Sequence, residues 1–395
     1  MRVETRRLRS GWTTGTCAAA AAAAAAAFCM GREAAWGEAR LPSGEAVRFP
    51  VKPVPFEGQV WHAVRKDAGD DPDVTDGVRV LARVERLAAS AAVSPLWYGT
   101  DGCPGLYLTG GTGIGVVTRR GLACPEGRHA INPVPRAMIF QAAEQALREA
   151  GARPGNEAFL IRLSIPEGAA LAARTFNPRL GIEGGISVLG TSGIVKPMSE
   201  EALLDTIRLE IHMKAAEGRR RLILTPGNYG ERFLKELGLP EDAAVLCSNF
   251  IRDAAVCAAE EGFERILLAG HIGKLIKIAG GAPNTHSRYG DRRMEILADC
   301  LRACAGKRRQ EALALAKGLV SCVTTEEALE RLEQAGLRDA VMAEAVRRMR
   351  EVLRRWTGAE KSGGPEMEVV TFSSVYGILG SSMDAEALKA WMREG

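Results

Sequence analysis

Three segments decide the fold of this 395-residue chain: LILTPGNYGERF (222–233), AVLCSNFIRDAAVCAAEEGF (244–263) and RILLAGHIGKLIKIAGG (265–281). In each segment a short apolar run ends at small or polar residues and then passes into a helical pattern. Short apolar runs that alternate with amphipathic segments are typical of βαβ units around a parallel sheet. We therefore predict an α/β fold for this part of the chain.

The three apolar runs align at an offset of 22 residues, which places Gly227, Asn249 and His271 at equivalent positions just beyond the predicted strands. Ligands of open α/β sheets bind outside the carboxyl ends of the strands. The sequence therefore predicts a functional edge formed by PGNYG, SNF and GHIGK. The Walker pattern fails at GHIGKL, since Leu275 stands where Ser or Thr is required, so a P-loop enzyme is disfavoured.

The composition indicates a globular protein of two domains, with no dense block of Lys or Arg and a formal net charge of +4. This balance argues against a nucleic-acid partner but leaves room for a local basic cleft that binds an acidic small molecule. Nine cysteines without a CxxC pair favour reduced thiols in the cytoplasm. We interpret Cys300 and Cys304 as buried helix residues rather than as metal ligands, and we expect no protein-bound metal.

The N-terminal region contains ten consecutive alanines, Ala18 to Ala27, preceded by TRRLRSGWTTGTC. The arginines superficially resemble a twin-arginine signal, but alanine is only weakly apolar and TTGTC intervenes. Thr13, Thr14 and Thr16 instead offer N-caps for an alanine-rich helix that packs closely against its neighbours. No apolar run approaches the ~20 residues that span a bilayer, so no membrane partner is expected.

Three further motifs each have two interpretations. The carboxylates of KDAGDDPDVTDG (66–77) either form a turn, which we favour, or bind a cation or orient a ligand. The glycines of GGTGIGVVT (110–118) fit no dinucleotide fingerprint and indicate a bend or a close backbone approach to a ligand. The small residues of 166–203 either wrap around a ligand or form a packed crossover.

The most concentrated polar segment is NTHSRYGDRRME (284–295), which is either a solvated helix start or part of the functional site. Helical patterns follow over about 310–321, 325–334 and 340–356. MEVVTFSSVYGILGSS (367–382) then predicts a strand and turn that join the αβ sheet. The residues alone leave a transferase, a hydrolase and a non-catalytic ligand carrier open.

Several blocks in order along the chain resemble the CbiD family, the cobalt-precorrin-5B C1-methyltransferases of oxygen-independent cobalamin biosynthesis. These are RSGWTTGTCAAAAA, KDAGDDPDVTDG, GGTGIGVVT with AINPVPRAMI, GGISVLGTSGIVKPMSEEAL, TPGNYGE, and AGHIGKLIKIAGG with NTHSRYGDRRME. The resemblance implies transfer of a methyl group from S-adenosylmethionine to ring carbon 1, which gives cobalt-precorrin-6A. It also implies a two-layer α/β domain over 1–215. The second domain, 216–395, would be Rossmann-like, with its core at 221–281, a helical extension and a return strand near 367–381.

Under this resemblance we assign three groups of candidate residues. The catalytic candidates are His271, His286 and Asp291. The donor-binding candidates are Pro226, Gly227, Asn228, Tyr229, Asn249, Gly270 and Gly273. The acceptor-binding candidates are Thr13, Thr14, Thr16, Asp70, Asp71, Gly111, Gly113, Lys196, Lys274, Arg288 and Arg293.

The implied partners are a cobalt-corrinoid substrate and, transiently, neighbouring enzymes of the pathway; a homodimer is compatible with the sequence. Cobalt would arrive inside the substrate, so the lack of a ligand cluster is no objection. The alternative from another class is a non-catalytic corrinoid- or nucleotide-binding α/β protein. A hydrolase or phosphotransferase is disfavoured because its loop motifs fail.

Overall fold

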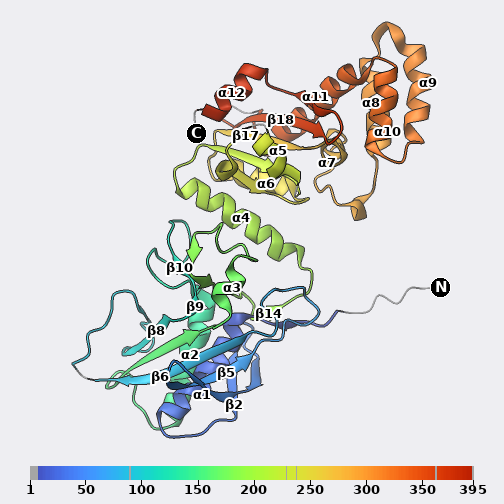
Figure 1. Ribbon diagram of the computed structural model, residues 1–395. Helices are drawn as coiled ribbons and strands as arrows, with labels where there is room; N and C mark the ends of the chain where they lie inside the picture. The colour runs from blue at the N-terminus through green and yellow to red at the C-terminus, as the bar shows by residue number, and fades with distance from the viewer. Residues whose placement is uncertain (1–7, 89, 228, 237, 361–362, 394–395) are drawn as a thin grey trace, which may run out of the picture. The chain divides into compact units, whose positions relative to one another are not determined.

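The computed structural model describes residues 8–88, 90–227, 229–236, 238–360 and 363–393. It divides into two compact units of mixed α/β structure, Met1–Glu200 and Glu201–Gly395 (Figure 1). The boundary expected at 215/216 therefore lies too late, because helix α4 (Glu200–Ala216) belongs to the second unit. Ile207 and Ile211 of this helix pack into the core of that unit, which explains the shift.

The first unit is built on a six-stranded sheet in the order β4-β5-β6-β11-β8-β7. Only the pairing of β11 with β8 is parallel, and the other neighbours are antiparallel. The strands are β4 (Lys52–Phe56), β5 (Gln59–Arg65), β6 (Arg79–Leu87), β7 (Tyr98–Gly99), β8 (Leu106–Gly110) and β11 (Ala158–Ser164).

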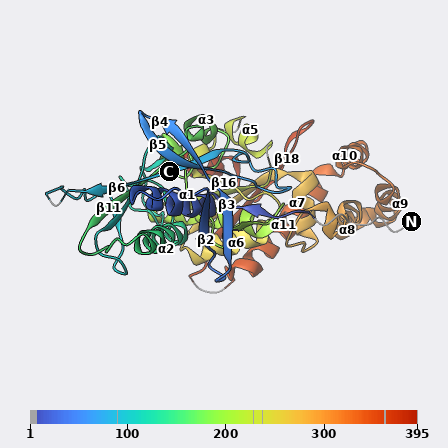
Figure 2. The same cartoon turned by 90° about the horizontal axis from the view of Figure 1, so that it is seen from below.

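Two helices, α1 (Thr14–Cys29) and α2 (Pro133–Glu149), pack side by side and contact this sheet (Figure 2). The alanine-rich helix is confirmed, and Ala18 to Ala26 are all buried. A helix that is apolar all round is suited to such a buried position. Methyl side chains also let neighbouring backbones approach closely: a Cβ on Gly37 of β2 (Trp36–Arg40) would lie 2.0 Å from the Ala20 carbonyl oxygen.

The segment 166–203 is a packed crossover. It contains α3 (Gly168–Ala172) and three short strands, β12 (Ile182–Glu183), β13 (Gly185–Ile186) and β14 (Ile194–Val195). These pair with β10 (Val116–Val117), β9 (Gly113–Ile114) and β1 (Gly11–Trp12), while β2 pairs with β3 (Ala46–Pro50). Ile186 and Val188 join the core of the unit. Much of this small-residue segment therefore pairs with other strands of the first unit or packs into its core.

The second unit contains a five-stranded sheet in the order β16-β15-β17-β18-β19. Its first four strands are parallel, and β19 runs antiparallel to β18. The strands are β15 (Arg221–Thr225), β16 (Ala244–Leu246), β17 (Arg265–His271), β18 (Glu366–Ser373) and β19 (Gly377–Ser381). The three predicted βαβ strands are confirmed, and so is the expectation that the C-terminal strand joins their sheet.

Helices cover both faces of this sheet (Figure 1). One face packs against α4, α6 (Ile251–Glu260), α7 (Ile272–Ala279) and α11 (Arg338–Thr357). The other face packs against α5 (Tyr229–Glu236) and α12 (Ala385–Arg393). A further group, α8 (Arg293–Cys304), α9 (Arg309–Val320) and α10 (Thr325–Gln334), extends the first core. The bounds of α9 and α10 lie close to the predicted helical ranges 310–321 and 325–334.

The nine cysteines are all free thiols. Cys300 is buried in α8, and the Cys304 thiol lies 3.5 Å from the Leu301 carbonyl oxygen within the same helix. Among the described residues no group of three or more His, Cys, Asp or Glu side chains is arranged to hold a metal ion. No helix in the described ranges is long and apolar enough to cross a membrane.

The close approach of β2 to α1 yields a stability prediction. Gly37→Ala should lower the free energy of unfolding by about 1–3 kcal/mol, because its methyl group would overlap the Ala20 carbonyl and force the elements apart. Gly102→Ala is the matched control, since a Cβ there would meet only the Thr100 hydroxyl, at 3.7 Å. Urea denaturation of both variants measures the difference, and equal stabilities would refute the close packing of α1.

Candidate functional site at the carboxyl ends of the second sheet

The parallel register brings three loops to one edge of the second sheet. Thr225 pairs with Leu246, and Leu224 pairs with Leu268, so the residues that follow β15, β16 and β17 leave the sheet side by side. This is the position at which open α/β sheets bind ligands. The register therefore brings the loops after β15, β16 and β17 to one edge, and a ligand-binding role for this edge stays a prediction.

Lys274, in the first turn of α7, connects the three loops. Its Nζ donates a hydrogen bond to Asn249 Oδ1 at 3.1 Å, which ties β17 and α7 to the loop after β16. A Cβ on Gly227, in the loop after β15, would lie 3.1 Å from the same Nζ. Gly227 also has a φ of +83°, a conformation that favours glycine. Gly227, Asn249 and Lys274 thus form one cluster, which we call the strand-end cluster.

Burial lowers the pKa of Lys274, and the neighbouring Lys277 ammonium lowers it further. Cys247, also nearby, is fully buried, and burial raises the pKa of its thiol to about 12, so it stays neutral. Lys277 itself is buried and donates to the carbonyl oxygens of Thr285 and Gly290, each at 3.2 Å. The cluster is therefore a partly buried, net positive environment.

His271 is both the last residue of β17 and the N-cap of α7. Its Nδ1 accepts a hydrogen bond from the Gly273 N–H at 3.1 Å, so the neutral ring carries its proton on Nε2. Nε2 lies 3.4 Å from Glu326 Oε1 of α10. Burial lowers the pKa of His271, although the Glu326 carboxylate opposes this shift. Both ring nitrogens therefore have protein partners.

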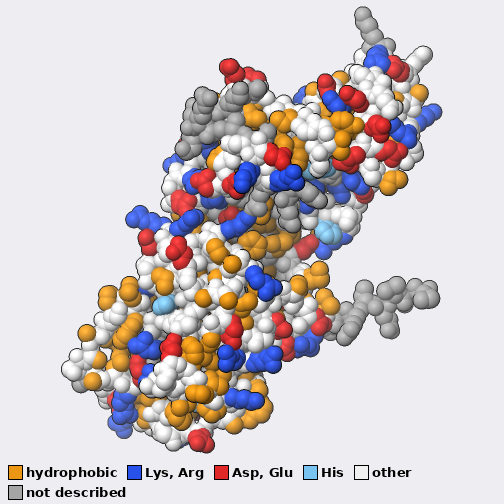
Figure 3. Space-filling model, in the orientation of Figure 1, with side chains coloured by type: hydrophobic (Ala, Val, Ile, Leu, Met, Phe, Trp, Pro, Cys, Tyr) orange, Lys and Arg blue, Asp and Glu red, His pale blue; other side chains and the backbone are white. Residues whose placement is uncertain are grey.

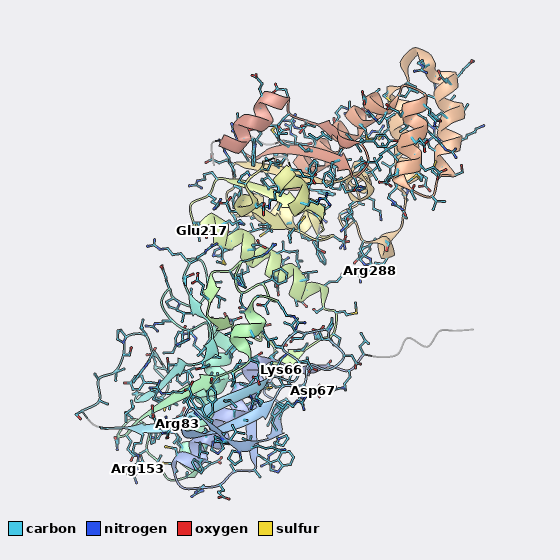
Figure 4. The ribbon with its side chains drawn as sticks, viewed as in Figure 1. Lys66, Asp67, Arg83, Arg153, Glu217 and Arg288 are labelled. Atoms are coloured by element: carbon cyan, nitrogen blue, oxygen red, sulfur yellow. The ribbon has the colours of Figure 1, made fainter. Side chains whose placement is uncertain are left out.

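The other two catalytic candidates lie on the loop between α7 and α8, where Figure 4 labels Arg288. His286 is exposed, and its Nδ1 accepts from the Arg288 N–H at 3.1 Å, capping the short 3-10 helix Ser287–Tyr289. Asp291 is exposed and forms a two-pronged pair with Arg293, with Nη2–Oδ2 at 2.6 Å and Nε–Oδ1 at 2.7 Å. This pair lowers the pKa of Asp291, which weakens it as a base.

No hydrogen bond or ion pair within the described ranges joins His271 to His286 or Asp291. The three catalytic candidates are thus not assembled into one constellation of hydrogen-bonded groups. Arg288 is exposed, and its Nη2 donates to the Tyr289 hydroxyl at 2.6 Å. Of the polar segment 284–295, only Thr285 is bonded directly to the strand-end cluster, through Asn249.

The donor-binding candidates lie mainly along the same edge. A Cβ on Gly270 would lie 2.9 Å from Pro226, so the end of β17 and the loop after β15 are in contact. Gly273 donates its N–H to His271, and Tyr229 begins α5. Asn228 falls outside the described residues.

The threonines of the first unit are buried and bonded to their own chain. Thr13 is the N-cap of α1, and its Oγ1 accepts from the Thr16 N–H at 3.3 Å. Thr16 Oγ1 donates to the Gly193 carbonyl at 2.7 Å, and Thr14 is also buried. This arrangement anchors the crossover on the start of α1.

Carboxylates of 66–77 form hydrogen bonds and ion pairs with other parts of the first unit, and Figure 4 labels Lys66 and Asp67 of this segment. Asp70 Oδ2 accepts from the Arg9 N–H at 2.7 Å, and Asp71 Oδ1 accepts from the Met198 N–H at 2.8 Å. Lys66 is buried and pairs with Asp73. The motif thereby holds the N-terminal segment and the end of the crossover in place.

Among the remaining acceptor candidates, Gly111 and Gly113 are partly or fully buried and Lys196 is exposed. Gly111 donates its N–H to the Leu163 carbonyl at 2.8 Å, and a Cβ on Gly113 would lie 1.8 Å from the Ile165 carbonyl oxygen. The close approach at these glycines is therefore to the chain's own backbone. In the view of Figure 3, Lys and Arg side chains are interspersed with Asp and Glu over the surface.

Several features of the second unit gave no usable signal in the sequence. Glu326 lies within the predicted helix 325–334, and its contact with His271 depends on tertiary packing. Thr225, at the end of β15, is fully buried, and its hydroxyl has no hydrogen-bond partner among the described residues. An open hollow of about 650 Å³ lies between α4 and α6, where His212 Nδ1 is 3.0 Å from Glu261.

Comparison with known proteins identifies the family. A family model described as CbiD matches residues 1–197, and a model described as CbiD, C-terminal domain, matches residues 284–383. The strand-end cluster lies between these two matched ranges. A crystal structure of a cobalamin biosynthesis protein (cbiD) from Archaeoglobus fulgidus is 27% identical and covers 69% of this chain and 80% of that one. Its TM-score of 0.37 is too low to inform the arrangement described above.

Three relatives, each named cobalt-precorrin-5B C(1)-methyltransferase, match most of the chain. The relative from Moorella thermoacetica is 43% identical over 88% of this chain and 90% of its own. The one from Ruminiclostridium cellulolyticum is 40% identical over 85% of this chain and 82% of its own. The one from Edwardsiella ictaluri is 40% identical over 97% of this chain and 95% of its own. The chain belongs to the CbiD family.

Proposed function

We propose that this protein methylates ring carbon 1 of cobalt-precorrin-5B to give cobalt-precorrin-6A in oxygen-independent cobalamin biosynthesis. Its relatives are named cobalt-precorrin-5B C(1)-methyltransferase, and one of them aligns with 97% of the chain. We propose S-adenosylmethionine as the methyl donor. A cytoplasmic location, a homodimer and transient contact with neighbouring pathway enzymes stay predictions.

The same proposal assigns the donor to the carboxyl ends of β15, β16 and β17. The observation that carries it is the convergence of Gly227, Asn249 and Lys274 at one edge of a parallel sheet. The residues present fit a polar ligand such as the donor, since the Lys274 ammonium and the Asn249 amide lie together at this edge. This assignment treats the second unit as Rossmann-like and the first as a two-layer domain that binds the acceptor.

When bound, the donor would supply a methyl group on a sulfonium; the substrate carbon would take this methyl by in-line displacement, the thioether would leave, and no protein nucleophile is needed. The chain's residues then have to bind, orient and enclose the reactants. Such positioning is worth ~7–11 kcal/mol in favourable cases. Lys196 and Arg288 are exposed and suit the acid side chains of a corrinoid, because charge-assisted hydrogen bonds to carboxylates are strong.

The proposal predicts that the purified protein transfers a labelled methyl group to the corrinoid. Incubation of cobalt-precorrin-5B with methyl-labelled S-adenosylmethionine should give a product one methyl group heavier, with the label at carbon 1. A non-catalytic corrinoid- or nucleotide-binding protein would bind either compound and leave the label on the donor. Mass spectrometry of the tetrapyrrole separates the two functions.

The contacts of His271 predict a positioning role. His271→Asn keeps a side-chain acceptor at the N-cap and should retain methyl transfer within about threefold. His271→Ala removes the cap and should cost about 1 kcal/mol of stability. Turnover and thermal melting of both variants check this. A loss of more than about a hundredfold in His271→Asn with unchanged melting would show instead that the imidazole takes part in the chemistry.

Burial of His271 also predicts a pH dependence of stability. Its pKa in the folded protein lies below the ordinary value of 6.5, so folding favours the neutral ring. The contribution of this ring is fully present above 6.5 and is lost as the pH falls toward the lowered pKa. Wild type should therefore lose more unfolding free energy than His271→Asn between about pH 7.5 and about pH 5.5. Parallel urea titration curves for the two proteins at each pH would contradict this.

A further inference from the structure

Lys274 differs from the other lysines that this fold encloses. Lys66 Nζ is paired with Asp73 and also donates to Thr75 Oγ1 at 2.8 Å. Lys277 Nζ donates to two carbonyl oxygens. Lys274 Nζ, by contrast, makes one hydrogen bond, to Asn249 Oδ1, and within the described ranges no carboxylate pairs with it. An ammonium has three N–H donors, so two remain for a ligand.

A partly buried charge of this kind is costly to the folded protein. Removing an ammonium from water costs free energy that only an opposite charge or several hydrogen bonds offset. Within the described ranges no carboxylate offsets this cost: burial raises the pKa of the Cys247 thiol to about 12, so the thiol is neutral near pH 7, and the neighbouring Lys277 lowers the pKa of Lys274. A neutral side chain could equally hold Asn249. The charge at position 274 is therefore best explained by a negatively charged ligand group.

The position of Lys274 distinguishes two sources for that group, the methyl donor and the corrinoid. Nζ lies against Gly227 at the strand ends, within the loops that follow β15 and β16. This setting suits a single carboxylate on a ligand seated at the edge of the sheet. The acid side chains of a corrinoid are numerous and reach outward, and exposed cations such as Lys196 and Arg288 suit them better.

We propose that Lys274 Nζ binds the carboxylate of the methionine part of the donor and thereby orients the donor along the strand ends. This role rests on the proposed function and moves Lys274 from the acceptor-binding group, where the sequence placed it, to the donor-binding group. Asn249 then holds the ammonium in position beside Gly227.

Binding of two donor analogues tests this role. S-Adenosylhomocysteine carries the amino-acid carboxylate, and 5′-methylthioadenosine lacks the amino-acid part. Calorimetric titration should show that Lys274→Met weakens S-adenosylhomocysteine binding about 10-fold to 100-fold, the loss expected for a charge-assisted hydrogen bond. The affinity for 5′-methylthioadenosine should stay within about twofold, and Lys274→Arg should restore part of the loss.

Lys317→Met is the matched control, since it removes one positive charge from an exposed site on α9. Lys274→Met should melt no lower than wild type, because it removes a charge that the protein leaves uncompensated. If Lys274→Met does not fold, the same titrations use Lys274→Gln, which keeps an N–H donor for Asn249.

Three outcomes would overturn the role of Lys274. One is an unchanged affinity for S-adenosylhomocysteine, and another is an equal loss for both analogues. The third is an unchanged donor affinity with a raised KM for the corrinoid, which would assign the carboxylate to the acceptor. If wild type itself binds neither analogue, the proposed donor fails as well, so the two failures can be told apart.

Discussion

The parallel register of β15, β16 and β17 is the constraint on which the candidate site depends. Because the three strands run in the same direction in one register, the loops that follow them leave the sheet at the same edge, and β17 continues past Leu268 to His271. The Lys274 ammonium then donates a hydrogen bond to Asn249, which lies 25 positions earlier in the chain. Without that register, Gly227, Asn249 and Lys274 would be three unrelated loop residues.

The first unit depends on a different constraint, the close approach of backbones. Its buried alanine helix and its glycines let strands and crossover come into contact at distances that a larger side chain would prevent. Thr13, Thr16 and Asp71 hold the crossover and the N-terminal segment in place. Several motifs that carry the family resemblance thus have structural roles. In our proposal, exposed cations such as Lys196 contact the acceptor instead.

The sequence predicted the second sheet well, because its apolar runs and the turn residues behind them are local signals. The alanine helix followed in the same way from its composition. The roles of individual site residues were less predictable. His271 was a catalytic candidate by its position, but its partner Glu326 is 55 residues away and no local pattern connects them. Nothing in the local sequence indicated that the Arg293 guanidinium would form a bidentate pair with the Asp291 carboxylate.

The roles of individual glycines were equally hard to predict from the sequence. Gly113 and Gly227 look equivalent in sequence, yet one faces the Ile165 carbonyl and the other faces the Lys274 ammonium. Only the fold distinguishes a glycine that admits the chain's own backbone from one that lies beside a partly buried ammonium. The domain boundary was misplaced for a related reason, since the apolar face of α4 does not itself reveal which core it joins.

The central claim is that the methyl donor binds at the carboxyl ends of the second sheet. A crystal structure of the protein with S-adenosylhomocysteine tests it most directly. We predict that the ligand lies along the loops after β15, β16 and β17, with its carboxylate within hydrogen-bond distance of Lys274 Nζ. A nucleoside bound elsewhere on the protein would contradict the account.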